Sequence, residues 1–171
     1  MNNFSESVIK ALGEAVQEAK KRKNTEITEA HLLSALLRED GGYFQTILKE
    51  LGIAVYPDLD KEFKRMPTFE GGGEARASAT LTALLQEAEV ICKKWNDTYI
   101  SSDHILMAFR KKGFFKELSE KELEKTILRL RGDRHIDSPM AEQNVKVLDK
   151  FCKNYTKLAK EGNTEPGITP I

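Results

Sequence analysis

Residues 25–36 read TEITEAHLLSAL, and residues 98–109 read TYISSDHILMAF. The two stretches align without gaps, and five of their twelve positions are identical. In each, a hydroxyl residue, Thr28 or Ser101, stands just before apolar residues at helical spacing, which predicts a capped amphipathic helix. The chain therefore contains two copies of one helical unit, and this internal duplication decides the fold.

The duplication extends beyond these two stretches. The same offset superimposes apolar positions of the preceding helix: Val8, Leu12 and Ala15 on Leu81, Leu85 and Ala88. Downstream, Lys-Glu-Leu occurs at residues 49–51 and again at 116–118, after a shorter connector. Each unit has an apolar stripe that must be covered, and the sister unit is the natural partner for it.

The sequence thus predicts an all-α fold of two four-helix repeats related by a pseudo-twofold axis. The first repeat covers residues 3–66 and the second covers residues 78–131, and a linker helix and tail occupy residues 132–171. Between the repeats, residues 67–77 contain three consecutive glycines, which predict a mobile connector. A phosphate-binding loop is not expected there, because no Lys-Ser or Lys-Thr pair follows the glycines and no strand precedes them.

Helix boundaries are marked at both ends of the chain. Asn3 followed by Glu6 predicts the cap of the first helix. Ser138 and Pro139 predict the start of a last long helix that runs to about residue 162. Its apolar positions recur every three or four residues, so this helix has a stripe suited to docking on another surface. The stripe consists of Val145, Leu148, Cys152, Tyr155 and Ala159.

The composition is that of a soluble globular protein. Apolar residues make up 40% and charged residues 32%, and 27 basic residues balance 27 acidic ones. Chains that bind polyanions usually carry a basic excess, so nucleic acid is not an expected partner. No leader sequence and no apolar run approaching about 18 residues is present, so no membrane partner is expected and the predicted location is cytoplasmic.

The cysteines and histidines predict structural roles. Cys92 and Cys152 fall in apolar helical patterns, which predicts buried thiols, and no CxxC motif or Cys/His cluster indicates a zinc site. His31 and His104 occupy the same place in both copies, without a nucleophile or acid at suitable spacing. We expect both to bond backbone or carboxylate groups in the first helical turn, and we expect no catalytic residue and no metal site. His135 lies in a polar break and is expected to be solvated.

The order and spacing of the two copies resemble a known family. The pattern Phe-Ser … Ile-Thr-x-x-His-Leu-Leu-x-Ala-Leu-Leu, followed by Asp-x-Tyr-Ile-Ser-Ser-Asp-His-Ile-Leu-x-Ala-Phe, is similar to the Clp N-terminal repeat of the Hsp100 unfoldases, from residue 4 to about residue 131. Residues 131–142, RGDRHIDSPMAE, look like the ClpB-type join to the first AAA+ ATPase module. No Walker A or Walker B motif is present. The resemblance therefore predicts a fragment that ends before its ATPase and is not an enzyme by itself.

The resemblance implies a substrate-recognition domain of a ClpB-type disaggregase, a stress-response chaperone. Such a domain binds exposed hydrophobic segments of unfolded or aggregated proteins and passes them to a homohexameric ATPase ring. It implies no cofactor in this chain, because ATP and Mg²⁺ belong to the absent ATPase modules. A hydroxyl and two acidic residues tied to substrate handling in the family match Ser5, Asp97 and Asp103. Apolar peptide is expected in a groove near four further residues: Ile91, Trp95, Tyr99 and His104.

Other interpretations of the same residues stay open. By themselves, Ser5, Asp97 and Asp103 also fit solvated structural positions in turns and first helical turns, and Trp95 also fits a core. A partner-specific N-domain of a ClpV-, ClpC- or ClpA-like ATPase is the alternative function. A symmetric phosphoarginine site of the ClpC type is not expected, because Ala30 and Asp103 stand where such domains carry glutamate before each histidine.

Overall fold

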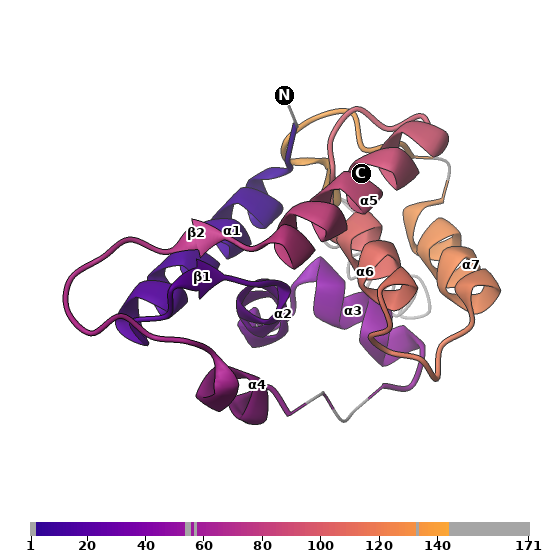
Figure 1. The fold of residues 1–171 in the computed structure, drawn as a ribbon. Coiled ribbons are helices and arrows are strands. Elements are labelled where there is room, and N and C mark those ends of the chain that lie inside the picture. The colour runs from indigo at the N-terminus through magenta and orange to yellow at the C-terminus, as the bar shows by residue number, and fades with distance from the viewer. Residues whose placement is uncertain (1–2, 54–55, 57, 133, 144–171) are drawn as a thin grey trace, which may run out of the picture.

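The computed structural model describes residues 3–53, 56, 58–132 and 134–143, and Figure 1 shows their arrangement. The elements in chain order are α1 (Glu6–Lys21), β1 (Glu26–Ile27), α2 (Glu29–Arg38), α3 (Tyr43–Glu50), α4 (Asp60–Arg65), β2 (Arg76–Ala77), α5 (Ala79–Lys94), α6 (Ser102–Lys111) and α7 (Glu120–Arg131). Helices therefore dominate, as the sequence predicts, and the two short strands form one parallel pair.

Serine or threonine stands at the start of α1, α2, α5, α6 and α7. The Ser5 hydroxyl accepts from the Val8 amide and caps α1, so Ser5 is the cap in place of the expected Asn3. Thr28 and Ser101 each form a capping box with the histidine three residues later. These reciprocal bonds satisfy amides that a helix start would otherwise leave unpaired. The two matching stretches thus fold into equivalent helix starts.

The core is one hydrophobic cluster that draws on both halves of the chain. Helix α1 packs on α2, and α5 packs on α6. Helix α3 contacts α2 on one side and α6 and α7 on the other, as Figure 1 shows. The ring of Phe44 in α3 lies 6.2 Å from that of Phe109 in α6, edge to face. Each half therefore covers apolar surface of the other, whereas the pseudo-twofold relation itself stays a prediction.

The second half differs from the expected four-helix unit. Residues 113–118, which match the end of α3 in sequence, form turns and not a helix. Gly113 has φ 104° and Phe115 has φ 55°, and a helix cannot continue through two positive φ angles. Among the described residues, the second half therefore has three helices where four were expected.

Both ends of the segment 67–77 are tied to β1 and the turn before it. The Thr25 amide donates to the Pro67 carbonyl, and the Phe69 amide donates to the Lys23 carbonyl. At the other end, residues 76–77 are β2 and pair with β1. The glycines between these ties are exposed, and the mobility of this segment stays a prediction. Of the predicted linker and tail, the apolar stripe and Cys152 lie outside the described residues.

Candidate functional site

A buried polar cluster lies between the turn after α5, the start of α6 and the end of α7. The Arg131 side chain is 2% exposed and reaches two carboxylates that are fully buried. Its guanidinium lies 3.0 Å from Asp97 Oδ2 and 2.8 Å from Asp103 Oδ2. The hydroxyl of Tyr43, from α3, donates to Asp103 Oδ2 at 2.8 Å. One cation therefore lies between two carboxylates in a largely buried site.

The cluster also fixes the tautomer of His104. The Ser101 amide donates to His104 Nδ1 at 2.9 Å, so the ring proton sits on Nε2 and is donated to Asp97 Oδ2 at 2.6 Å. In the first half, His31 Nδ1 accepts from the Thr28 amide, and its Nε2 lies 2.8 Å from Asn24 Oδ1. The predicted structural role of both histidines is thus confirmed.

The two halves differ in charge at equivalent positions. Asp97 stands where the first half has Asn24, and Asp103 stands where it has Ala30. The second half therefore contains two carboxylates that the first half lacks, and Arg131 compensates for them. This charged cluster is a specialisation of the second copy.

The environment keeps both carboxylates ionised. Burial raises the pKa of Asp97, but hydrogen bonds from His104 and the Ile136 amide and the charge of Arg131 outweigh it, so the pKa is lowered. The pKa of Asp103 is also lowered, because surrounding cationic and donor groups outweigh its complete burial. Burial raises the pKa of the Cys92 thiol to about 11, and the thiol lies within the core. This cysteine is therefore an inert buried thiol, as predicted.

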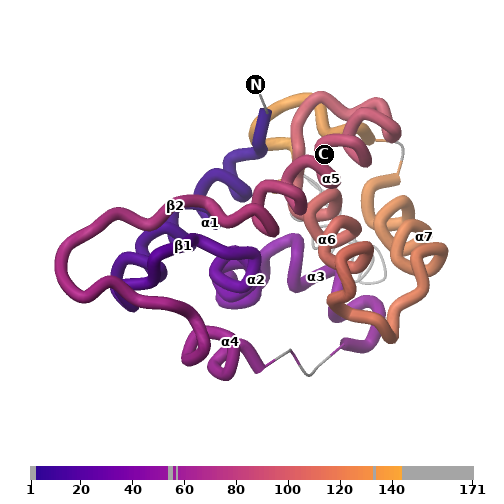
Figure 2. The backbone as a smooth tube through the Cα atoms, in the orientation of Figure 1, coloured from indigo at the N-terminus to yellow at the C-terminus, as the bar shows by residue number. Residues whose placement is uncertain are grey.

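Residues 134–142, called the strap below, cross the cluster on their way to α1. In Figure 2 this segment is orange and runs across the top of the molecule to the N-terminal end of α1. The Ile136 amide donates to Asp97 Oδ1 at 2.9 Å, and its carbonyl accepts from the amides of Thr98 and Tyr99. The Ile136 side chain is fully buried. Farther along, the Pro139 carbonyl accepts from the Glu6 amide.

The strap ends at a buried carboxylate, Glu142. Its Oε1 accepts from the Ser5 hydroxyl at 2.5 Å and from the Ser102 amide at 2.9 Å, and its Oε2 accepts from the Ser102 hydroxyl at 2.5 Å. Complete burial raises the pKa of Glu142 to about 7, although these hydrogen bonds oppose the shift. Asp103 adds a repulsive charge from α6. Glu142 joins the strap to the starts of α1 and α6.

A pocket of about 340 Å³ opens beside the cluster, and it is called the Trp95 pocket below. Its lining comes from the end of α5, from α7 and from the strap: Trp95, Glu124, Leu128, Arg131, Gly132, Arg134 and His135. The Trp95 ring is half-buried, 5.4 Å from the His104 ring and 5.3 Å from the Arg131 guanidinium carbon. Leu128 is 51% exposed. The pocket thus combines two apolar surfaces with a charged rim.

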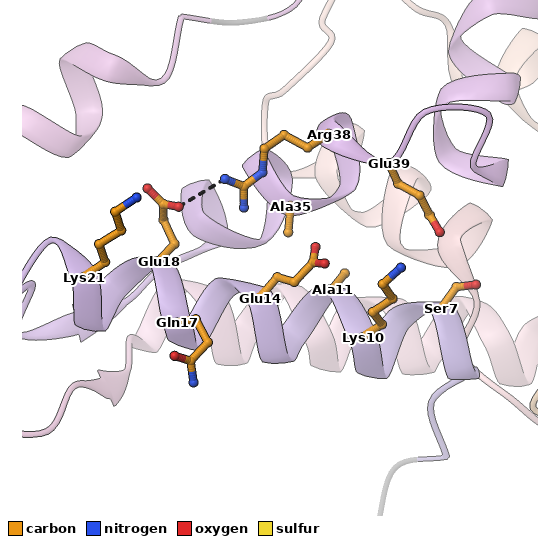
Figure 3. A pocket seen from close by; sticks show the side chains of 10 residues that line it. All are labelled: Ser7, Lys10, Ala11, Glu14, Gln17, Glu18, Lys21, Ala35, Arg38 and Glu39. Carbon is orange, nitrogen blue, oxygen red and sulfur yellow. Dashed lines mark hydrogen bonds and ion pairs between the residues drawn. The ribbon is translucent and has the colours of Figure 1, made fainter.

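Another cavity, of about 380 Å³, lies along α1 and α2 (Figure 3). Two lysines and two glutamates line its α1 side, and Arg38 of α2 forms an ion pair with Glu18 across it at 3.1 Å. A third cavity, of about 450 Å³, lies near α4 and the start of α2. Neither cavity was anticipated from the sequence. The first is a trough of mixed charge in which Arg38 and Glu18 pair with each other.

The predicted site residues separate into two groups. Ser5, Ile91, Asp97, Asp103 and His104 are buried, whereas Trp95 and Tyr99 are half-buried. The expectation that Ser5, Asp97 and Asp103 are solvated is wrong, because neighbouring charges and hydroxyls hold all three inside. The structure brings Asp97, Asp103, His104 and Trp95 together, and it connects Ser5 to them through Glu142.

The sequence did not single out Tyr43, Leu128, Arg131 or Glu142 as site residues. His135 is exposed, as expected, and its Nδ1 lies 3.3 Å from Asp97 Oδ1. Within the described ranges, no group of three or more His, Cys, Asp and Glu side chains has the geometry to hold a metal ion. No helix in that part of the chain is long and apolar enough to span a membrane.

Comparison with known proteins identifies relatives of this fold. The family model of the Clp repeat (R) N-terminal domain matches residues 3–121. The chaperone protein ClpB of Chlamydia muridarum is 37% identical over 181 residues, which cover 98% of this chain and 21% of that protein. The chain therefore spans about a fifth of the length of the curated relatives it matches.

Solved structures agree with that comparison. The Hsp104 N-terminal domain from Candida albicans has a TM-score of 0.66 at 26% identity, covering 82% of this chain and 99% of that one. The N-terminal domain of the ClpV1 ATPase from E. coli has a TM-score of 0.63 at 22% identity, covering 75% of this chain and 86% of that one. The second likeness extends to the fold alone.

Proposed function

Because the chain belongs to the Clp repeat N-terminal domain family, we propose that it recognises polypeptide substrates for a ClpB-type remodelling ATPase. The ligand is an exposed hydrophobic segment of an unfolded or aggregated protein. The observation that carries the proposal is the Trp95 pocket, in which a half-buried indole and the exposed Leu128 side chain form one concave surface.

The chemistry of the pocket suits such a ligand. Trp95 and Leu128 provide apolar surface for one or two side chains, and burying that surface drives association. Glu124, from α7, provides a polar group at the rim for the peptide backbone. A shallow pocket on one domain buries little area, so binding to the isolated chain is expected to be micromolar or weaker.

Three buried residues lie behind the pocket lining: Asp97, Asp103 and His104. His104 packs against Trp95, and both carboxylates hold Arg131, which lines the pocket. We propose that these residues act on the substrate chiefly by positioning Trp95 and Arg131. Ile91 and Tyr99 contribute to the adjoining core.

For the whole protein we propose a cytoplasmic homohexamer. Its ATPase modules, outside this chain, use ATP and Mg²⁺, and the N-domain delivers bound segments to them. Several N-domains on one ring raise the effective concentration of binding sites and offset the weak affinity of each.

Binding of a labelled, permanently unfolded model protein to the isolated chain tests the proposal. Leu128→Ser is expected to weaken binding about fivefold, since losing the apolar contact costs about 1 kcal/mol. Val90→Ser is the matched control, because Val90 is an exposed apolar residue, at 59% against 51% for Leu128, and does not line the pocket.

If Leu128→Ser and Val90→Ser lose the same binding affinity, and circular dichroism shows that both variants are folded, the assignment of the pocket is contradicted. Binding of one defined helical partner without binding of unfolded proteins supports the alternative, a partner-specific N-domain of the ClpV, ClpC or ClpA kind.

A further inference from the structure

We infer that the strap is an internal competitor of the polypeptide ligand and that Glu142 latches it closed. Opening of the strap would then regulate access to the Trp95 pocket and to the backbone groups beside it. The inference rests on the proposed function, because it concerns how the same site is regulated.

The strap makes the contacts that a bound peptide would make. One residue, Ile136, pairs its amide with Asp97 Oδ1 and its carbonyl with the amides of Thr98 and Tyr99, at 2.9 to 3.1 Å. Its side chain enters the core completely. Extended backbone with an apolar anchor is also what an unfolded segment offers. The chain therefore fills, with its own residues, a position suited to a hydrophobic peptide.

The strap also shapes the pocket. Arg134 and His135, just before Ile136, form one wall of the Trp95 pocket. Moving the strap away widens the pocket on that side. It also uncovers Asp97 Oδ1 and the amides of Thr98 and Tyr99, which become an acceptor and two donors for an incoming backbone.

The strap has few apolar anchors of its own. Ile136 and Ala141 are the apolar residues of the strap that are buried, whereas Arg134, Asp137 and Met140 are exposed. A segment with few buried apolar contacts opens at a lower free energy than the core does. Closure therefore depends strongly on polar bonds, and three of these converge on Glu142 at the far end of the strap.

Glu142 is the latch at that end. It is 1% exposed, and it accepts three hydrogen bonds from Ser5 and Ser102, which begin α1 and α6. These two helices come from opposite halves of the chain. One side chain thus holds the strap across both halves.

Amide hydrogen exchange and binding, measured on the same three proteins, test the inference. The proteins are wild type, Glu142→Ala and the control Gln143→Ala, which changes the half-buried neighbour of the latch. In Glu142→Ala we expect the amides of Thr98 and Tyr99 to exchange at least tenfold faster, while the amides of α2 are unchanged. We expect the same variant to bind the unfolded model protein several-fold more tightly than wild type and Gln143→Ala. If Glu142→Ala does not fold, Ser102→Ala, which removes the hydroxyl that donates to Glu142 Oε2, takes its place.

Two results overturn the inference alone. Unchanged exchange at Thr98 and Tyr99 shows that Glu142 does not hold the strap. If the wild type binds the unfolded protein, and Glu142→Ala exchanges faster without binding more tightly, the strap does not compete with the ligand. Absence of binding by all three proteins overturns the proposed function and the competition together, whereas the exchange rates still decide whether Glu142 is a latch.

Discussion

Replacing Asp103 by alanine is expected to destabilise the domain strongly. The substitution removes the acceptor of the Tyr43 hydroxyl and one of the two carboxylates that balance Arg131. Arg131 then keeps its ion pair with Asp97 but loses the acceptor of its Nε, Asp103 Oδ2. The alanine at the equivalent position of the first half, Ala30, faces no such arginine, so alanine itself is compatible with this helix position.

The magnitude follows from the burial of the cluster. Hydrogen bonds to a charged group contribute about 1.5–3 kcal/mol each, so losing those from Tyr43 and Arg131 to Asp103 is expected to cost about 3–5 kcal/mol in total. In a protein of this size, each kcal/mol lowers Tm by about 2–4 °C, so the expected fall is roughly 6–20 °C. Arg131→Met combined with Asp103→Ala removes both members, and we expect the double variant to be at least about 1 kcal/mol more stable than the sum of the single losses implies.

Urea unfolding followed by far-UV circular dichroism measures these free energies. Asp40→Ala, at an exposed carboxylate, is the control and is expected to change stability by less than about 0.5 kcal/mol. An Asp103→Ala variant within about 1 kcal/mol of wild type, or strictly additive losses in the cycle, would refute the idea that the carboxylates and Arg131 form one buried charged unit.

Three further predictions concern other parts of the chain. Because the pKa of Glu142 is raised above its ordinary value of 4.5, its stabilising contribution is full below pH 4.5 and is lost as pH rises through about 7. We expect the stability of wild type relative to Glu142→Gln to fall by about 3 kcal/mol across this window, and a constant difference would contradict the raised pKa. Replacing residues 70–74 by a glycine-serine link should change unfolding free energy by less than about 0.5 kcal/mol, because these residues are exposed between the backbone ties at 67–69 and 76–77; a loss above about 1 kcal/mol would show that the segment is packed. The pure chain should not turn over ATP in a coupled phosphate-release assay, because its sequence contains no phosphate-binding loop; turnover that follows the protein through purification would contradict the domain assignment.

Structural features that depend on residues close together in the sequence were predicted well. Thr28 with His31 and Ser101 with His104 are three residues apart, so the capping boxes and the roles of the histidines follow from spacing alone. The helices themselves follow from apolar periodicity. The missing helix at 113–118 is the exception, because the positive φ angles of Gly113 and Phe115 are not visible in a hydrophobic pattern.

The site depends on contacts between distant residues. Arg131 reaches Asp103 across 28 positions, and Glu142 reaches Ser102 across 40 and Ser5 across 137. Nothing in the spacing indicates that an arginine at the end of one helix will enter the core. A comparison of the two copies offered one clue, since Asp97 and Asp103 replace Asn24 and Ala30 and so require a cation nearby.

The fluorescence of Trp95 gives the most direct test of polypeptide binding at its pocket. Trp95 is the single tryptophan of the chain, so its emission reports this pocket alone. Titration with an unfolded polypeptide that lacks tryptophan is expected to shift the emission to shorter wavelength, saturably and with the midpoint found by anisotropy of the labelled ligand. Saturable anisotropy with no change in Trp95 emission would place the ligand elsewhere on the domain and contradict the proposal.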